Sequence, residues 1–254
     1  MFDLKNKVVL VTGASRGIGA AIATAVGQAG ADLVLHYGKS RAAAEQVAAG
    51  LDRSHTALVG ADLNNDDETQ RLWRDAVAWK GRVNVLILNA GMMDWAGPDD
   101  DFAKWDDVLR RTLQTNVFAA AHLCRDAIRH FRTQGGGIII AISSHVAHQG
   151  VRAGNSMAYA ASKACLKALM QSIARCYSRE NILTYTIAPG LTATEIAEDF
   201  ITKFGKREDI LNELPMKEMV PPEDIAHICA FLATGSSRHA TGTTIDVTGA
   251  NYIR

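Results

Sequence analysis

A tyrosine and a lysine, Tyr159 and Lys163, stand four residues apart at the start of the stretch MAYAASKACLKALMQSIARCY. Apolar residues recur in this stretch at steps of three and four, which predicts an amphipathic helix. On a helix that spacing puts the phenol and the ammonium on one face, one turn apart. A phenol with a pKa of about 10 is a poor base at neutral pH, and a nearby cation favours its ionised form. The pair therefore predicts a tuned acid–base group, with a purely structural Tyr–Lys pair as the alternative.

Three glycines, Gly13, Gly17 and Gly19, lie in the stretch TGASRGIG directly after an apolar run. Their spacing, G-x-x-x-G-x-G, differs from the commoner dinucleotide pattern G-x-G-x-x-G. The physics is shared, because glycines permit a tight turn and let the backbone approach a pyrophosphate at a helix N-terminus. The loop therefore predicts dinucleotide binding. A glycine turn required only for steric reasons is the alternative.

The end of the second apolar run, LVLHYGKSRAAAE, bears on which dinucleotide is bound. Positions 36–38 offer no Asp or Glu to accept a ribose 2′-hydroxyl,. Lys39 and Arg41 follow instead, and Arg16 lies inside the glycine loop. Because such cations attract a 2′-phosphate, the sequence favours NADP(H) over NAD(H). In the alternative interpretation, Lys39 and Arg41 only cover the first turn of a helix.

The composition limits the classes of partner. The 27 basic and 27 acidic side chains cancel, which argues against a nucleic acid or a polybasic membrane contact,. No apolar run approaches membrane-spanning length, and the four cysteines are far apart, as in a reduced compartment,. The histidines show no spacing such as H-E-x-x-H, so no metal is predicted,. We expect a soluble cytoplasmic protein.

Short β-branched runs alternate with helical patterns along the whole chain. The runs are apolar on both faces, as in strands that helices cover on both sides. This order predicts an α/β fold: a single domain over residues 1–254 with a doubly wound, Rossmann-like parallel sheet of about seven strands and helices on both faces. The strands are expected at 7–12, 31–37, 56–61, 83–90, 137–143, 182–188 and 243–248, and the helices near 17–29, 40–51, 66–79, 103–133, 156–179 and 223–233.

The segment 191–219 interrupts the alternation after the sixth expected strand. It is partly helical and rich in charge, and a segment of that length at the carboxyl end of a strand predicts a lid over a site,. A pair of solvated surface helices is the alternative.

Four motifs occur in one order: TGASRGIG, NAG (Asn89–Gly91), Tyr159-x-x-x-Lys163 and Pro189-Gly190. Together they resemble the short-chain dehydrogenase/reductase family over nearly the whole chain. The resemblance implies that Tyr159 is the general acid or base at a carbonyl oxygen. It also implies that Lys163 lowers the pKa of the phenol and bonds the nicotinamide ribose.

The resemblance extends to two further catalytic positions, Ser144 and Asn116. Ser144 matches the serine that hydrogen-bonds the substrate oxygen, although it lies two residues farther from Tyr159 than is usual in the family. Ser143, one residue away on a strand, should face the opposite side. Asn116 resembles the asparagine that anchors a proton-relay water beneath the lysine, with an exposed or N-capping asparagine as the alternative.

The predicted cofactor site combines the residue-level argument with the resemblance. Asp62 resembles the family aspartate near the adenine, but an Asp that only caps a turn is a strong alternative. Thr194 matches a contact to phosphate or carboxamide. The full set is Gly13, Ser15, Arg16, Gly17, Ile18, Gly19, Lys39, Arg41, Asp62, Leu63, Asn89, Ala90, Gly91, Tyr159, Lys163, Pro189, Gly190, Thr192 and Thr194.

The leading hypothesis is an NADP(H)-dependent oxidoreductase that interconverts a ketone and a secondary alcohol, nearest in layout to 3-oxoacyl-thioester reductases. An NAD-dependent sugar, polyol or steroid-type alcohol dehydrogenase is the alternative. From a different class, an idle cofactor-binding sensor would be free to lose Tyr159 or Lys163, and both are present. The family implies a homotetramer or homodimer through 103–133 and 156–179. His145 and His148, beside Ser144, are expected to be solvated loop histidines, with substrate contact as the alternative.

Overall fold

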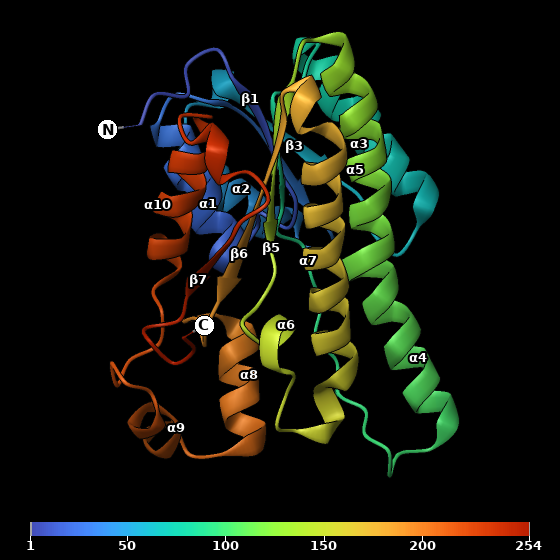
Figure 1. Cartoon of the computed structure of the whole chain (residues 1–254), viewed down its shortest axis with the longest axis vertical. Helices are drawn as coiled ribbons and strands as arrows, with labels where there is room; N and C mark the ends of the chain where they lie inside the picture. The colour runs from blue at the N-terminus through green and yellow to red at the C-terminus, as the bar shows by residue number, and fades with distance from the viewer. Residues whose placement is uncertain (1, 254) are drawn as a thin grey trace.

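Seven parallel strands form one sheet in the order β3-β2-β1-β4-β5-β6-β7 in this computed structural model, which describes residues 2–253. Helices cover both faces of the sheet (Figure 1). Because the strand order reverses between β1 and β4, the sheet is doubly wound, and the predicted Rossmann-like α/β class is confirmed,. The strands are β1 (Val8–Val11), β2 (Asp32–Tyr37), β3 (Thr56–Gly60), β4 (Val85–Leu88), β5 (Gly137–Ile142), β6 (Ile182–Pro189) and β7 (Thr244–Val247).

Apart from four short 3₁₀ turns, the helices fall between the strands at the positions that the apolar periodicity predicts, with four additions. A π-helical segment divides one long helix, and the short helices α6, α8 and α9 were not separately predicted. The bounds are α1 (Gly17–Gln28), α2 (Arg41–Ala49), α3 (Asp66–Lys80), α4 (Phe102–Leu113), the π-helical segment Gln114–Phe118, α5 (Ala119–Thr133), α6 (Val146–Gln149), α7 (Met157–Tyr177), α8 (Glu195–Phe204), α9 (Arg207–Glu213) and α10 (Pro222–Ala233).

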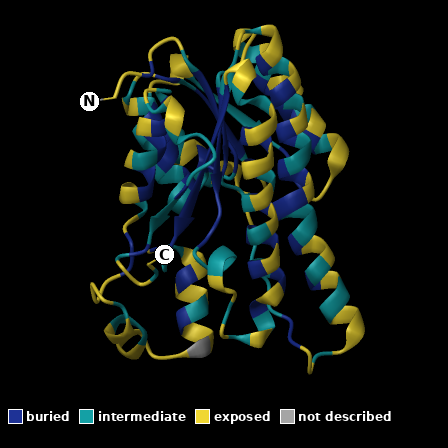
Figure 2. Cartoon of the chain, in the orientation of Figure 1, coloured by how far each residue is buried: buried dark blue, intermediate teal, exposed yellow. Residues whose placement is uncertain are grey.

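Two apolar layers enclose the sheet. In β1, Val9 and Val11 face the layer beneath α1 and α10, whereas Val8 and Leu10 face the layer beneath α3, α5 and α7. The strands β1, β4 and β6 are therefore buried on both faces, whereas the edge strands β3 and β7 are largely half-buried (Figure 2). Burying one such side chain contributes about 1.5–3 kcal/mol, so these layers hold the carboxyl ends of the strands in place.

The helix expected over 103–133 is divided by the π-helical segment Gln114–Phe118. There the N–H of Ala119 bonds to the carbonyl of Gln114, five residues back. A π turn fits one more residue than an α turn, and such turns are frequent at functional sites. The periodicity of apolar residues does not reveal this extra residue. Asn116 lies in the middle of the segment.

The elements that follow the carboxyl ends of β5 and β6 gather at the lower end of the molecule in Figure 1. They are α6 and the segment 191–219, which forms α8, α9 and the loops around them. Ala197, Ile201 and Met219 form a small apolar cluster of their own within this segment. Its action as a lid stays a prediction. Among residues 2–253, no helix is long and apolar enough to cross a membrane.

Candidate active site

The glycine loop adopts a conformation that other residues would resist. Gly13 and Gly17 have φ angles of 64° and 52°, in the left-handed region that favours glycine,. At Gly19, an added Cβ would lie 2.2 Å from the carbonyl oxygen of Gly13. Helix α1 begins at Gly17, and its N-cap residue Arg16 makes no side-chain cap bond. The positive end of the helix therefore stays available to an anion, which fits a pyrophosphate.

Two polar side chains hold this loop against the end of β4. Thr12 Oγ1 accepts the N–H groups of Asn89 and Ala90, each at 3.0 Å. Asn89 Nδ2 in turn donates to the carbonyl oxygens of Thr12 and Gly13 at 3.0 Å. The reciprocal bonds bring two predicted cofactor segments together, and β4 ends at Leu88 because the next N–H turns to Thr12.

His36, at the end of β2, is a site residue that the sequence did not identify. Its buried imidazole accepts the N–H of Gly13 at Nδ1, and its Nε2 bonds the carbonyl of Ala61, both at 3.0 Å. These partners assign the neutral ring with the proton on Nε2. Burial lowers the pKa of His36 to about 4, although the bond to Ala61 opposes the shift. The histidine joins the glycine loop to the segment that carries Asp62.

The three cations predicted near the adenosine phosphate have different surroundings. Arg16 forms an ion pair with Glu195, the first residue of α8. Arg41 pairs with Glu45 one turn along α2, at 2.8 Å, as in the alternative in which it covers a helix turn. Lys39 is exposed and lies near Asp62.

Asp62 makes the bonds of a turn-capping aspartate. Its carboxylate accepts the backbone N–H of Asn64 at 2.9 Å and the side-chain amide of the same residue at 3.0 Å. These bonds from Asn64, and secondarily the charge of Lys39, lower the pKa of Asp62. The turn-capping alternative therefore describes its contacts. Three further residues of the predicted cofactor set lie near Asp62 or within the glycine loop in the sequence. Leu63 packs into the apolar layer beneath α3, Ile18 packs against the opposite layer, and Ser15 is partly buried in the glycine loop.

Tyr159 and Lys163 lie on the first turns of α7, as predicted, with Lys163 Nζ 5.6 Å from the centroid of the phenol ring. Ser144, two residues after the end of β5, lies close enough to the phenol of Tyr159 to favour its ionised form. Lys163 is 4% exposed, and its ammonium donates to the carbonyl of Ile142 at 2.9 Å. The structure thus brings three of the predicted catalytic residues together.

The pKa of the phenol differs from the sequence-based expectation. Burial raises the pKa of Tyr159 to about 12, and the nearby Ser144 hydroxyl only opposes that shift. Lys163 does not reverse it, because its ammonium lies over the ring and is directed at Ile142. Burial lowers the pKa of Lys163 itself to about 8. The lysine is therefore the group of this pair that titrates near neutral pH.

Ser143 and Asn116 complete the buried surroundings of Lys163. Ser143 donates its hydroxyl to the carbonyl of Lys163 at 2.8 Å, so Ser144 is the serine that meets the phenol. Asn116 is 1% exposed, which excludes the alternative of an exposed residue. Its side chain bonds both the N–H and the carbonyl of Met92, at 2.9 and 3.0 Å. An added Cβ at Gly91 would lie 3.2 Å from Lys163 Nζ and 3.4 Å from Asn116 Oδ1, so the two side chains flank this glycine.

The segment after β6 contacts the glycine loop through Thr194. An added Cβ at Gly17 would lie 3.2 Å from the methyl group of Thr194, and Thr194 caps α8 by accepting the N–H of Ala197. Thr192 is buried and donates to the carbonyl of Gly190 at 3.1 Å. The glycine cradle and the uncapped start of α1 fit the pyrophosphate of a dinucleotide,.

The expectation of solvated histidines after Ser144 is wrong for His148, whose side chain is 5% exposed. Its ring bonds Asp246 and Lys167, both at 3.0 Å. His145 is partly buried and bonds the carbonyl of Pro189 through Nδ1 at 3.1 Å. A short loop rich in polar residues does not reveal these partners, because they come from other strands and helices.

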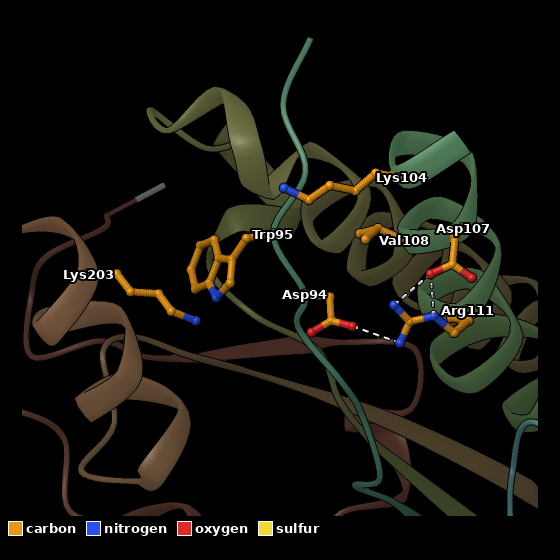
Figure 3. A pocket seen from close by; sticks show the side chains of 7 residues that line it. All are labelled: Asp94, Trp95, Lys104, Asp107, Val108, Arg111 and Lys203. Carbon is orange, nitrogen blue, oxygen red and sulfur yellow. Dashed lines mark hydrogen bonds and ion pairs between the residues drawn. The ribbon is translucent and has the colours of Figure 1, made fainter. Parts of the chain in front are cut away.

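A cavity of about 610 Å³ opens beside Trp95, between the loop after β4, helix α4 and helix α8 (Figure 3). The indole Nε1 of Trp95 donates to Asp199 at 3.2 Å, and Lys203 Nζ lies 5.5 Å from the ring centroid. These contacts join the loop after β4 to α8. Arg111, on the opposite wall, pairs with Asp94 and Asp107. The lining residues are Asp94, Trp95, Lys104, Asp107, Val108, Arg111 and Lys203.

Comparison with known proteins matches the chain along almost its full length. The model of a family described as enoyl-(acyl carrier protein) reductase matches residues 13–249. L-rhamnose 1-dehydrogenase (NAD(P)(+)) of Sphingomonas sp. is 33% identical, over 98% of this chain and 98% of that protein. 3beta-hydroxysteroid dehydrogenase 1 of Eggerthella lenta is also 33% identical, over 97% and 94%.

A solved structure shows the same arrangement of elements. The 3-oxoacyl (acyl-carrier-protein) reductase of Agrobacterium tumefaciens with NADP bound superposes with a TM-score of 0.87. It is 29% identical, and the match covers 98% of this chain and 95% of that one. With the family model, the full-length relatives and the Ser144–Tyr159–Lys163 geometry in agreement, the chain belongs to the short-chain dehydrogenase/reductase family of oxidoreductases.

Proposed function

We propose that the protein is an NADP(H)-dependent oxidoreductase that interconverts a ketone and a secondary alcohol, with Tyr159 as the acid–base residue. The observation that carries this proposal is that the phenol of Tyr159 lies beside Ser144 and the buried Lys163, whose Nζ is 5.6 Å from the centroid of the phenol ring. These groups lie at the carboxyl end of the sheet, where ligands of doubly wound folds bind.

The chain's own groups supply the proton chemistry. A nicotinamide cofactor, when bound, supplies or accepts the hydride. Because the pKa of Tyr159 is raised to about 12, the phenol holds its proton at neutral pH and serves as the acid for reduction,. Ser144 orients the carbonyl oxygen next to it. Lys163, with its pKa of about 8, resupplies the proton, together with water held by Asn116.

The preference for NADP(H) rests on Arg16 and Lys39. Arg16 lies in the glycine loop and Lys39 follows the end of β2, which is where a 2′-phosphate would be recognised,. The two residues at the carboxyl end of β2, His36 and Tyr37, carry no carboxylate that would repel this phosphate, and the buried ring of His36 is neutral. Arg41 contributes less, because Glu45 already pairs with it.

For the substrate we propose a 3-oxoacyl thioester or a related small ketone, in line with the fold of the acyl-carrier-protein reductase. A sugar or steroid-type alcohol is the second candidate, because full-length relatives carry those activities in their names. The cavity lined by Trp95, Arg111 and Lys203 is the proposed place where the rest of the substrate would be selected.

We also propose a domain organisation, a location and an oligomeric state. Residues 1–254 form one domain, and segment 191–219 acts as its substrate lid, consistent with the contacts of Thr194 and Glu195 at the glycine loop. The protein is cytoplasmic and forms a homotetramer or homodimer. Phe118 and Met157, 50% and 41% exposed on the helices expected to pair, support that assembly.

Turnover of a substrate panel tests the function. Ketones, 3-oxoacyl thioesters and sugars are each supplied with NADPH and with NADH, and absorbance at the nicotinamide band is followed. We expect turnover of at least one ketone, faster with NADPH, and a loss of about 100-fold or more in Y159F. Y177F, at the far end of the same helix, is the matched control and should retain full activity. No turnover in the panel, or full activity in Y159F, contradicts the proposal, whereas a preference for NADH contradicts only the cofactor assignment.

A further inference from the structure

A buried polar chain links helix α6 to two other elements beside the active site. His148 Nε2 lies 3.0 Å from Asp246 Oδ1 on β7, and its Nδ1 lies 3.0 Å from Lys167 Nζ on α7. The imidazole also stacks on Tyr252, with ring centroids 5.1 Å apart and an interplanar angle of 3°. With its side chain 5% exposed, His148 is enclosed by these groups.

The chemistry of the three groups fixes the direction of the hydrogen bonds. An ammonium has no lone pair, so Lys167 donates and Nδ1 of His148 accepts. The neutral ring then carries its proton on Nε2, which donates to the carboxylate of Asp246. Bonds to charged partners are stronger than those between neutral groups, and low exposure strengthens them further. The two bonds therefore fix both the position and the rotation of the ring.

Helix α6 depends on such contacts, because it has only four residues, Val146–Gln149. A single turn is not stable by itself, since helix nucleation is unfavourable and most helical stability comes from packing. Its other end is held by His145, whose N–H and Nδ1 both bond the carbonyl of Pro189, at 3.0 and 3.1 Å. Contacts at His145 and His148 thus fix the turn at both ends.

Ser144 belongs to this same turn. Its carbonyl accepts the N–H of Ala147 at 3.0 Å, and its hydroxyl accepts the N–H of Val146 at 3.4 Å. The hydroxyl also meets the phenol of Tyr159. A shift of the turn would move this hydroxyl away from the phenol, and misplacement by about 1 Å can slow a reaction 100-fold.

We propose that His148 is a positioning residue: through its bonds to Lys167 and Asp246 it holds segment 144–150 and thereby keeps Ser144 aligned with Tyr159. The proposal rests on the proposed function for its effect on turnover.

His148→Ala tests the proposal by two measurements on the full-length protein. Hydrogen–deuterium exchange of residues 144–150 should become about tenfold faster or more, because their opening no longer breaks the bonds of His148. In the turnover assay kcat should fall about tenfold or more, while the Kd for NADPH, which binds at the glycine loop, stays unchanged. Unchanged exchange overturns the proposal, and so does faster exchange with unchanged kcat.

Two further variants separate positioning from general loss of structure. H148Q, whose amide N–H can still donate to Asp246, should recover part of both the kcat and the exchange protection. H55A is the matched control, because His55 also pairs with an aspartate, Asp32 at 2.7 Å, but on the exposed surface by β3. It should leave exchange of 144–150 and kcat as in wild type; an equal effect in H55A overturns the proposal.

If H148A does not fold, K167M removes only one of the two bonds, and unchanged exchange at 144–150 in that variant overturns the proposal. A wild-type protein that turns over no carbonyl refutes the proposed function instead. In that case the exchange of residues 144–150 in H148A, which needs no substrate, still decides whether His148 holds the turn.

Discussion

Arg16 lies where two anions can compete for one guanidinium. In the structure it pairs with Glu195 at the start of α8, and both side chains are well exposed, at 66% and 70%. The proposed NADP(H) preference requires the same side chain to turn toward a 2′-phosphate. Pairing with Glu195 and the proposed pairing with the cofactor therefore oppose each other at a single residue.

Glu195→Gln should shift this competition toward the cofactor. An exposed ion pair stabilises by about 0–1 kcal/mol, so freeing Arg16 should tighten NADPH binding by up to about fivefold. The Kd for NADH, which has no 2′-phosphate, should change less. Fluorescence titration with both cofactors measures the ratio. Equal tightening of NADPH and NADH binding would show that the Arg16–Glu195 pair only restricts cofactor entry. The matched control is Glu195→Gln in the R16Q background, where the Kd for NADPH should not change.

Tyr159 shows what residue spacing leaves undetermined at this scale. The four-residue step predicts that the phenol and the ammonium share one helix face, and they do. The sign of the pKa shift depends instead on burial and on where the ammonium points, which are properties of the folded chain,.

At the scale of elements, the strand-to-helix turns and the apolar runs are local patterns and were predicted to within one or two residues. The π-helical segment that places Asn116, the turn that carries His148 and the contacts of His36 were not. Each depends on partners far along the chain, such as His148 with Asp246 or His36 with Gly13. Pattern reasoning on one segment contains no information on such pairs.

The close packing of α1 against the end of β1 gives a sharp test of the glycine loop. Gly19→Ala would place a Cβ 2.2 Å from the carbonyl of Gly13 and 2.4 Å from Asn89 Nδ2. The loop must then shift, which should destabilise the fold by about 1–3 kcal/mol and abolish cofactor binding. Urea unfolding and NADPH titration measure the two effects.

Gly50→Ala, at the end of α2, is the matched control for that change. Its added Cβ would meet only the carbonyl of Val47 at 3.7 Å, an ordinary contact. It should therefore leave both stability and NADPH binding near wild type. If G19A binds NADPH as tightly as G50A does, the glycine loop does not approach the cofactor in the proposed way.

At the scale of the whole molecule, His36 is a neutral histidine that connects the glycine loop to the end of β3. His36 is 1% exposed, and burial lowers its pKa from 6.5 to about 4. Below pH 6.5 the unfolded chain takes up a proton that the folded chain excludes until about pH 4. Folding stability contributed by this residue is therefore present above pH 6.5 and lost as the pH falls toward 4.

The size of that loss makes it measurable. A shift of this extent corresponds to about 3 kcal/mol between the two pH limits. His36→Asn keeps an acceptor for the N–H of Gly13 but does not titrate, so its free energy of unfolding should decline less between pH 7 and pH 4.5. Urea unfolding of both proteins at these pH values measures the difference. H227N, which removes an exposed histidine, should follow wild type. An equal decline in wild type and H36N would mean that protonation of other groups destabilises the fold in acid.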